Sequence, residues 1–227
     1  MDHDYEVVII GAGPVGMAMA ALLGRFGVHV LVVDRLNAIQ TDPRAIALDN
    51  EALRILAMCG LVLEDLDLVT IPAVNYRSPF FGRFGRMNTL DSVDTLPPLV
   101  TFFQPALEAS LAAQAQVTGS VQVLRGARAQ VIENSEAGAL VRAHDLKDGT
   151  ERDLKARFVV ACDGAGSSTR QSLGVDFLGV SYSQDWLIVD ALNVPESVEE
   201  ITFYCDPARL APHMPAPGGR QRWEFML

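Results

Sequence analysis

A glycine motif close to the first residue constrains the fold of this chain most strongly. Val7–Ile10 is an uninterrupted run of β-branched residues, which is typical of a parallel strand buried on both faces. Gly11, Gly13 and Gly16 follow with the spacing G-x-G-x-x-G. In that pattern the first glycine permits a tight turn, the second lets the backbone approach a pyrophosphate, and the third lets a helix pack on the strand. The motif predicts a helix whose N-terminus faces phosphate groups.

The residues after the motif complete a βαβ pattern. Met17–Phe26 is small and apolar and predicts a helix that Gly27 ends. Val28–Val33 predicts a second strand, and Asp34 stands at its end. An acid about twenty residues past such glycines accepts hydrogen bonds from a ribose diol. The alternative is a glycine-rich turn in some other α/β protein, with Asp34 an ordinary carboxylate at a strand end.

Composition fits a packed enzyme domain and excludes several partners. The chain has 227 residues, is 49% hydrophobic and carries a net charge of −10 with 18 basic residues, so nucleic acid and anionic membranes are poor partners. The three cysteines lie far apart and the four histidines are scattered, so we predict no metal site and a reduced, cytoplasmic setting. Val7–Leu23 is uncharged, but its glycines and the acidic residues before it indicate neither a membrane span nor a signal peptide.

A second strand, turn and helix are predicted far along the chain. Phe158–Cys162 indicates a buried strand that ends at Asp163–Gly164. Ser167 then serves as the N-cap of a short helix, Ser168–Leu173. We expect this turn to reach the same kind of cofactor-binding edge, where an aspartate can hold a ribose or a pyrophosphate through N–H groups or water. In isolation, Asp-Gly would indicate a plain turn.

The remaining elements are predicted more coarsely. A helix is expected over Asn50–Met58 with Asp49 as its N-cap, and another from Pro105 to about Gln116. Asp148–Gly149 predicts a hairpin between the last two strands of an antiparallel insertion. Its predicted strands are Val121–Leu124, Ala127–Glu133, Ala139–Leu146 and Glu151–Lys155. From Trp186 the pattern indicates longer strands, interrupted by a proline-rich loop over Pro207–Gly219.

Several segments together resemble one enzyme family. The chain is similar to the N-terminal part of class A flavoprotein aromatic hydroxylases, the group typified by p-hydroxybenzoate hydroxylase, and within it to 3-(3-hydroxyphenyl)propionate hydroxylase-like proteins. The matching segments are GAGPVG (Gly11–Gly16), VLVVDR (Val30–Arg35), PRAIALDNEALR (Pro43–Arg54), FFQPALEASL (Phe102–Leu111), VACDGAGSSTR (Val160–Arg170), WLIVDA (Trp186–Ala191), YCDPAR (Tyr204–Arg209) and RQRWEFML (Arg220–Leu227).

The resemblance implies an architecture. It is an α/β fold: a Rossmann-like FAD- and NAD(P)-binding domain with inserted antiparallel strands, followed by the beginning of a mixed-sheet substrate domain. We expect the cofactor domain over residues 1–175, with part of the substrate face at about 73–103, and an incomplete substrate sheet over 176–227 that leaves an unpaired apolar edge. The family continues well beyond the position of Leu227, so the chain is expected to be a truncated form.

The resemblance also implies a set of FAD-binding residues. The glycines would bind the pyrophosphate through backbone N–H groups, and a planar guanidinium at Arg44 would reach the same anion. Gln104 would face the ribityl chain or the flavin, or act only at the N-terminus of its helix, and Ala129 would pass the adenine. The residues implied to bind the cofactor are Gly11, Gly13, Pro14, Val15, Gly16, Asp34, Arg35, Arg44, Gln104, Ala129, Asp163 and Gly164. No catalytic side chain is nominated.

The chemistry implied is hydroxylation of a phenolic, phenylpropanoid-type ring. NADH or NADPH would reduce FAD, and the reduced flavin would add dioxygen to give a C4a-hydroperoxide that the phenol attacks. Partners would be the phenol and dioxygen, with a homo-oligomer or a missing C-terminal half left open. Two alternatives stay open: another flavoenzyme of the same fold, such as a reductase or halogenase, and a non-catalytic fragment with weak or no FAD binding.

Overall fold

The computed structural model describes residues 3–227, which form two compact units. The first unit comprises the residues up to Asp42, Ile55–Leu61 and Pro105–Leu178. The second comprises Pro43–Arg54, Val62–Gln104 and Gly179–Leu227. Each unit therefore draws on several separate stretches of the chain and has its own sheet.

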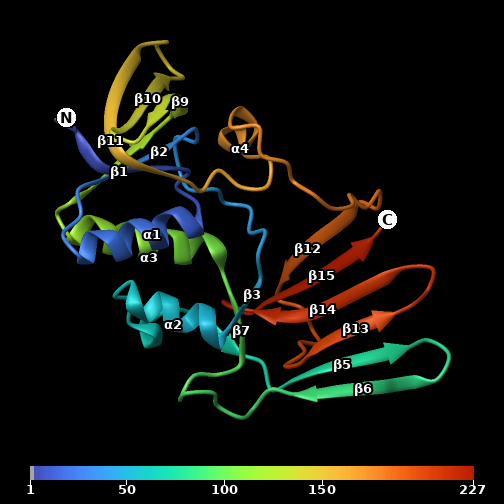
Figure 1. Ribbon diagram of the computed structural model, residues 1–227. Helices are drawn as coiled ribbons and strands as arrows, with labels where there is room; N and C mark the ends of the chain where they lie inside the picture. The colour runs from blue at the N-terminus through green and yellow to red at the C-terminus, as the bar shows by residue number, and fades with distance from the viewer. Residues whose placement is uncertain (1–2) are drawn as a thin grey trace. The chain divides into compact units, whose positions relative to one another are not determined.

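The first unit contains a six-stranded sheet with a parallel half and an antiparallel half (Figure 1). Four strands of this sheet are parallel neighbours and three are antiparallel neighbours, because one strand belongs to both halves. Helices α1 (Pro14–Arg25) and α3 (Gln104–Val117) lie side by side on one face of the parallel half. The strand order is β8 (Val121–Arg125), β2 (Val30–Asp34), β1 (Tyr5–Ile10), β11 (Glu151–Ala161), β10 (Gly138–Asp145) and β9 (Ala127–Ser135). The prediction that Val121–Leu124 belongs to the antiparallel insertion is wrong, because β8 pairs parallel with β2.

The parallel strands are buried on both faces, as their β-branched runs predict. Val8 and Val33 pack on one face, in a cluster that includes Val141 of the antiparallel half. Ile9 and Val32 are also fully buried, and they lie on the opposite face because side chains alternate along a strand. The predicted βαβ unit is confirmed.

The strand β11 is longer than the sequence pattern indicates. Two separate strands, Glu151–Lys155 and Phe158–Cys162, are predicted, but one continuous strand spans Glu151–Ala161. Its first half pairs antiparallel with β10, and its second half pairs parallel with β1. The polar residues in its middle resemble a break, but they lie where the strand exchanges one neighbour for another. The predicted Asp148–Gly149 turn does join β10 to β11, with Gly149 at φ +76°.

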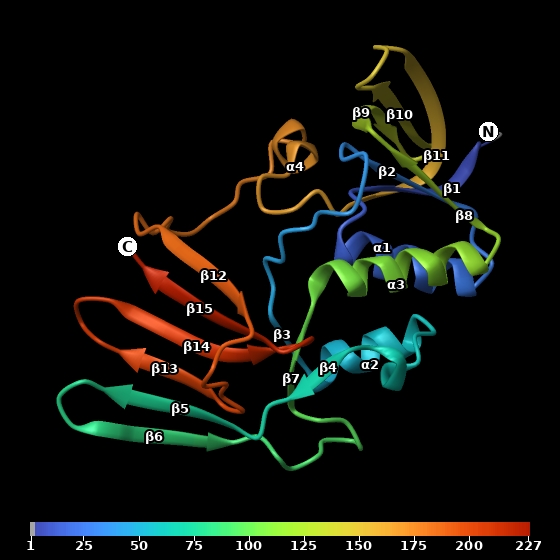
Figure 2. The ribbon, with the colours of Figure 1, turned by 180° about the vertical axis from the view of Figure 1, so that it is seen from behind.

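The second unit contains another six-stranded sheet (Figure 2). Neighbouring strands in this sheet run antiparallel, apart from one parallel pair in its middle. Its strand order is β12 (Trp186–Leu192), β15 (Arg220–Met226), β14 (Leu210–Ala216), β13 (Ile201–Cys205), β5 (Ala73–Ser78) and β6 (Gly82–Asn88). A smaller sheet holds β3 (Ala47–Asp49), β7 (Leu99–Phe102) and β4 (Leu68–Thr70). Buried Ile71, Val74, Ile201 and Met214 form a core cluster here.

The predicted loop over Pro207–Gly219 is wrong, because β14 runs through it. Proline removes a ladder hydrogen bond and therefore argues against a central strand. Even so, Pro212 pairs with Phe203 and Pro215 with Gln221, on opposite sides of β14. Met214 is 4% exposed, so burial of this strand outweighs the donors that its prolines lack.

The predicted helices are present, with side-chain caps at two of them. Asp49 accepts a hydrogen bond from the N–H of Ala52 at 2.8 Å, at the start of α2 (Asn50–Met58). Ser167 accepts one from the N–H of Arg170 at 2.9 Å, at the start of α4 (Ser168–Ser172). A short 3-10 helix, η1, spans Leu63–Asp65. Within residues 3–227, no helix has the length and apolar character needed to cross a membrane.

Candidate cofactor site

The glycine turn has the geometry that its spacing predicts. Gly11 has φ +105°, which favours glycine, and its N–H donates to the carbonyl of Val33 at 2.8 Å. A Cβ at Gly16 would fall on the carbonyl oxygen of Gly11, so the third glycine lets α1 pack against the turn. At Gly13, by contrast, an added Cβ would meet nothing within 4 Å. The middle glycine therefore borders open space, where a ligand can approach the backbone.

The N-terminus of α1 lies directly after this open position. Gly13 is the N-cap, Pro14 occupies the first helical turn, and the first helical bond runs from the N–H of Met17 to the carbonyl of Gly13. The N–H groups of a helix's first turn have no carbonyl partner within the helix, and the helix dipole is positive there. Val15 is 70% exposed. The turn thus offers donors and partial positive charge to an anion.

Asp34 ends β2 and contacts the glycine turn. One carboxylate oxygen accepts from the N–H of Ala12 at 2.5 Å, and the other from the N–H of Leu36 at 2.7 Å. These bonds fix the carboxylate beside the glycines, and each oxygen keeps a second lone pair for a hydroxyl donor. Arg35, the next residue, is exposed. An acid held here by the main chain fits recognition of a ribose diol.

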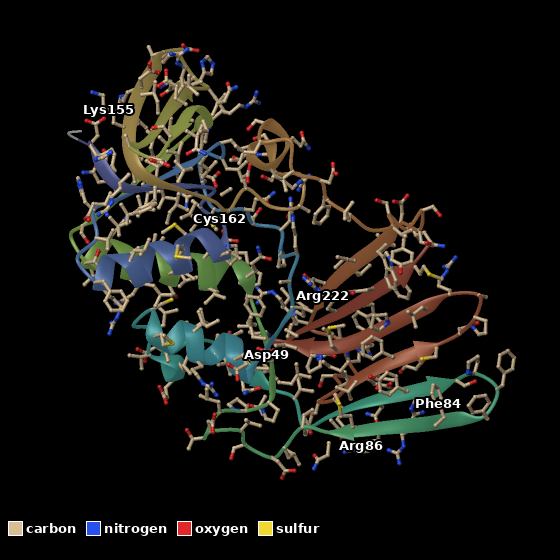
Figure 3. The ribbon with its side chains drawn as sticks, in the orientation of Figure 1. Asp49, Phe84, Arg86, Lys155, Cys162 and Arg222 are labelled. Atoms are coloured by element: carbon tan, nitrogen blue, oxygen red, sulfur yellow. The ribbon has the colours of Figure 1, made fainter. Side chains whose placement is uncertain are left out.

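The Asp163 turn lies against the glycine turn. The N–H of Cys162 donates to the carbonyl of Ile10 at 2.7 Å, and a Cβ built on Gly11 would lie 3.2 Å from the Cα of Asp163. Cys162 is labelled at this end of β11 in Figure 3. Burial raises the pKa of its thiol, and the charge of Asp163 raises it further. The two turns therefore lie at one edge of the same sheet.

Asp163 itself is the acceptor for the start of α4. Its carboxylate accepts from the hydroxyl of Ser167 at 2.5 Å and from the N–H and hydroxyl of Thr169 at 3.0 and 3.1 Å. Partial burial raises the pKa of this carboxyl, but these hydrogen bonds outweigh it and hold the pKa below its ordinary value. Gly164, at φ +82°, completes the turn. The side chain is therefore an ionised group that shapes the turn.

Arg44 and Gln104 belong to the second unit and meet there. The carboxamide oxygen of Gln104 accepts from the N–H groups of Arg44 and Ala45, each at 2.9 Å. The Arg44 residue is exposed. Gln104, the first residue of α3, therefore holds the peptide that carries Arg44.

Two further residues bear on the site: Ala129 was predicted from the sequence, and Arg222 was not. Ala129 lies on β9 opposite Ala143, and its side chain is buried in the core of the first unit. Arg222 is fully buried and donates to the carbonyls of Pro43 and Arg44. Sequence reasoning missed its role, because an arginine in RQRWEFML gives no sign of which peptide it contacts. The one available signal is a charged residue inside a predicted strand, directly before Trp223.

Comparison with known proteins identifies the family. A family model described as an FAD binding domain matches residues 4–223. The chain belongs to this FAD-binding domain family. The glycine turn, the helix N-terminus and the carboxylate of Asp34 fit such a cofactor, because they offer donors to a pyrophosphate and an acceptor to a ribose.

The chain is similar to curated proteins that are named as hydroxylases of hydroxyphenyl compounds. The 3-(3-hydroxy-phenyl)propionate/3-hydroxycinnamic acid hydroxylase of Escherichia coli (strain K12) is 32% identical over 229 residues. The match covers 100% of this chain and 41% of that protein. The chain therefore spans about two fifths of the length of the curated relatives it matches.

Solved structures share the fold of this chain. p-Nitrophenol 4-monooxygenase from Pseudomonas putida has a TM-score of 0.88 at 23% identity, over 100% of this chain and 58% of that one. Aklavinone-11 hydroxylase, solved with FAD and aklavinone, has a TM-score of 0.76 at 25% identity, over 100% of this chain and 46% of that one. The mixed α/β architecture is therefore that of flavin-dependent monooxygenases.

Proposed function

We propose that these 227 residues bind FAD and that the bound flavin serves the hydroxylation of a phenolic ring. The observation that carries the proposal is the glycine turn, where Gly13 opens to free space at a helix N-terminus and Asp34 is fixed beside it. Membership of the FAD-binding domain family and hydroxylase relatives support it.

In this proposal the N–H groups of Gly13, Val15 and Gly16 donate to the pyrophosphate. Gly11 permits the tight turn instead, because its own N–H is already bonded to the carbonyl of Val33. Pro14 supplies no donor, but its fixed φ favours the start of α1. Asp34 accepts from a ribose hydroxyl with its remaining lone pairs.

Other residues have supporting roles in the proposal. Arg44 adds a guanidinium to the pyrophosphate, and Gln104 holds the Arg44 peptide. Asp163 and Gly164 shape the neighbouring turn, where N–H groups or water reach the cofactor. Arg35 lies beside the ribose, and the backbone of Ala129 passes the adenine.

The reaction is proposed from the family and from the chemistry of the cofactor. When bound, the flavin supplies hydride acceptance from NADH or NADPH and oxygen transfer from dioxygen to the ring. The protein's own residues bind the cofactor, orient it and exclude water. The curated relatives are named for 3-(3-hydroxyphenyl)propionate, so a phenol with a phenylpropanoid side chain is the proposed substrate.

The organisation and setting of the protein are part of the proposal. Residues 1–175 form the cofactor domain, with part of the substrate face at about 73–103, and 176–227 contribute to the substrate sheet. The protein works in the cytoplasm, where NADH and NADPH are supplied. A second copy of the chain, or a C-terminal portion such as the relatives carry, covers the apolar edge of that sheet.

The test is a coupled assay on the FAD-loaded chain. NADH or NADPH oxidation is followed at 340 nm with 3-(3-hydroxyphenyl)propionate, and the products are separated by chromatography. A dihydroxylated ring formed only with FAD, reduced nicotinamide and phenol together supports the proposal. Bound FAD with no ring product would contradict the hydroxylation and leave FAD binding standing.

A further inference from the structure

Arg222 is a charged residue inside the second unit. It lies on β15, is 0% exposed, and is the largest fully buried side chain among the described residues (Figure 3). A buried guanidinium must have partners for its donors, because removing an unpaired charge from water is strongly unfavourable.

The guanidinium of Arg222 donates hydrogen bonds to one carboxylate and to two backbone carbonyls. Nε and Nη2 form a bidentate pair with Asp190 of β12, at 2.7 and 2.8 Å. Nη2 also donates to the carbonyl of Pro43 at 3.1 Å, and Nη1 to the carbonyl of Arg44 at 3.4 Å. Glu224 lies 3.9 Å from Nη1. The ion pair with Asp190 thus orients a planar fork toward two successive carbonyls.

The same short peptide is held from its donor side by Gln104. That carboxamide accepts the N–H groups of Arg44 and Ala45 at 2.9 Å each, while Arg222 donates to the carbonyls of Pro43 and Arg44. Both polar sides of the peptide are therefore bound, all within one unit. Arg44 and Ala45 are both exposed, and Arg44 carries the one charged side chain of this peptide.

Stability alone gives little reason for an arginine at position 222. Replacing a buried ion pair by apolar residues of similar volume is often neutral or stabilising. An apolar residue, however, cannot donate to the carbonyls of Pro43 and Arg44. We propose that Arg222 is a positioning residue that fixes the Pro43–Ala45 peptide so that Arg44 meets the cofactor pyrophosphate, an inference that rests on the proposed FAD function.

The test is a double-mutant cycle on FAD affinity, measured by quenching of flavin fluorescence. The four proteins are the unaltered chain, Arg222→Met, Arg44→Ala and the double variant. Loss of a group that orients a metal ligand lowers metal affinity by roughly 10–100-fold, and by that analogy Arg222→Met is expected to raise the Kd for FAD about tenfold. In the Arg44→Ala background, the same change is expected to have no further effect, because Arg222 acts through Arg44.

A purely structural role gives a different result in the same cycle. Arg222→Met would then weaken FAD binding by the same factor with and without Arg44, and that additivity would overturn the proposal. Equal affinity of Arg222→Met and the unaltered chain would overturn it too. An unaltered chain that binds no FAD would instead refute the proposed function.

Two further variants keep the test valid. Arg86 of β6 also forms a bidentate pair, with Glu200 at 2.8 Å for both bonds, but it is more exposed and does not contact the Pro43–Ala45 peptide. Arg86→Met is therefore the control for loss of such a pair elsewhere in the unit and is expected to leave the Kd unchanged. If Arg222→Met fails to fold by circular dichroism, Arg222→Lys takes its place in the cycle. Lysine keeps the buried charge but lacks the planar fork, so it is expected to weaken binding only when Arg44 is present.

Discussion

Gly13 and Gly16 lie three residues apart, but a methyl group meets different surroundings at the two positions. At Gly16 it would fall on the backbone carbonyl oxygen of Gly11, whereas at Gly13 it meets open space. Gly13 also has φ −74°, which alanine adopts without strain. Gly16 is therefore needed for the packing of the fold, whereas Gly13 is needed for the approach of a ligand.

Alanine substitutions test this separation. Gly16→Ala is expected to lower the free energy of unfolding by about 1–3 kcal/mol, since the backbone must shift to admit the methyl group. Gly13→Ala is expected to leave stability within about 0.5 kcal/mol and to weaken FAD binding by roughly tenfold, or about 1.4 kcal/mol. Urea unfolding and flavin-quenching titrations measure the two effects. Equal loss of stability in both variants would contradict the assignment.

The carboxylate of Asp163 gives a prediction about pH. Its hydrogen bonds from Ser167 and Thr169 lower its pKa from the ordinary 3.8, so the unfolded chain takes up a proton at higher pH than the folded chain does. The stabilisation is therefore present above the ordinary pKa and is lost as the pH falls through the folded value.

Replacing this carboxylate by an amide removes the effect. Asp163→Asn is expected to lower stability at pH 7 by about 1–2 kcal/mol, because a charged acceptor becomes a neutral one in a partly exposed site. Melting temperatures from pH 7 to pH 3 give the measurement, and the gap between the two proteins should narrow progressively as the pH falls below about 4. A gap that is constant over this range would exclude an ionised Asp163 as the source.

Local spacing predicts some of these residues, and long-range pairing places others. The packing at Gly16 and the caps at Asp49 and Ser167 depend on neighbours within a few positions. The Arg222 contacts join residues that are 178 and 179 positions apart. No local pattern encodes such a pairing, so it was found only in the folded unit.

At the scale of elements, β12 is the edge strand of the sheet in the second unit. It pairs with β15 alone, and Leu187 and Val189, two of its apolar residues, are 49% and 37% exposed. An exposed apolar edge strand favours pairing with another chain. We therefore expect the chain to self-associate through this strand.

A lysine on this edge tests that expectation. Leu187→Lys is expected to shift the chain toward the monomer in light scattering coupled to gel filtration, because a charge at an edge opposes strand addition. Leu146→Lys is the matched control, since Leu146 is 46% exposed but lies outside the described strands. If both variants associate as the unaltered chain does, the edge of β12 is not the interface.

The errors in element prediction share one physical cause. Polar residues inside β11 and prolines inside β14 both indicate breaks when they are read locally. In each case tertiary pairing overrides the local signal: β11 pairs with β10 and then β1, and β14 lies between β13 and β15. The strands around the glycine motif were predicted well because burial on both faces leaves an unbroken apolar run.

At the scale of the whole molecule, the chain is one family domain that spans 41% of its curated relatives' length. The FAD-binding fold is shown by that family match and by the shared architecture. The substrate and the reaction are proposals, since they depend on the whole protein.

The measurement that tests FAD binding most directly is the visible absorption spectrum of the chain after mixing with FAD and gel filtration. We predict a two-band flavin spectrum that elutes with the protein, at one FAD per chain. The Gly13→Ala variant should retain less flavin under the same conditions. A folded chain, checked by circular dichroism, that elutes colourless while all the flavin elutes as free dye would contradict the assignment of the glycine turn as an FAD site.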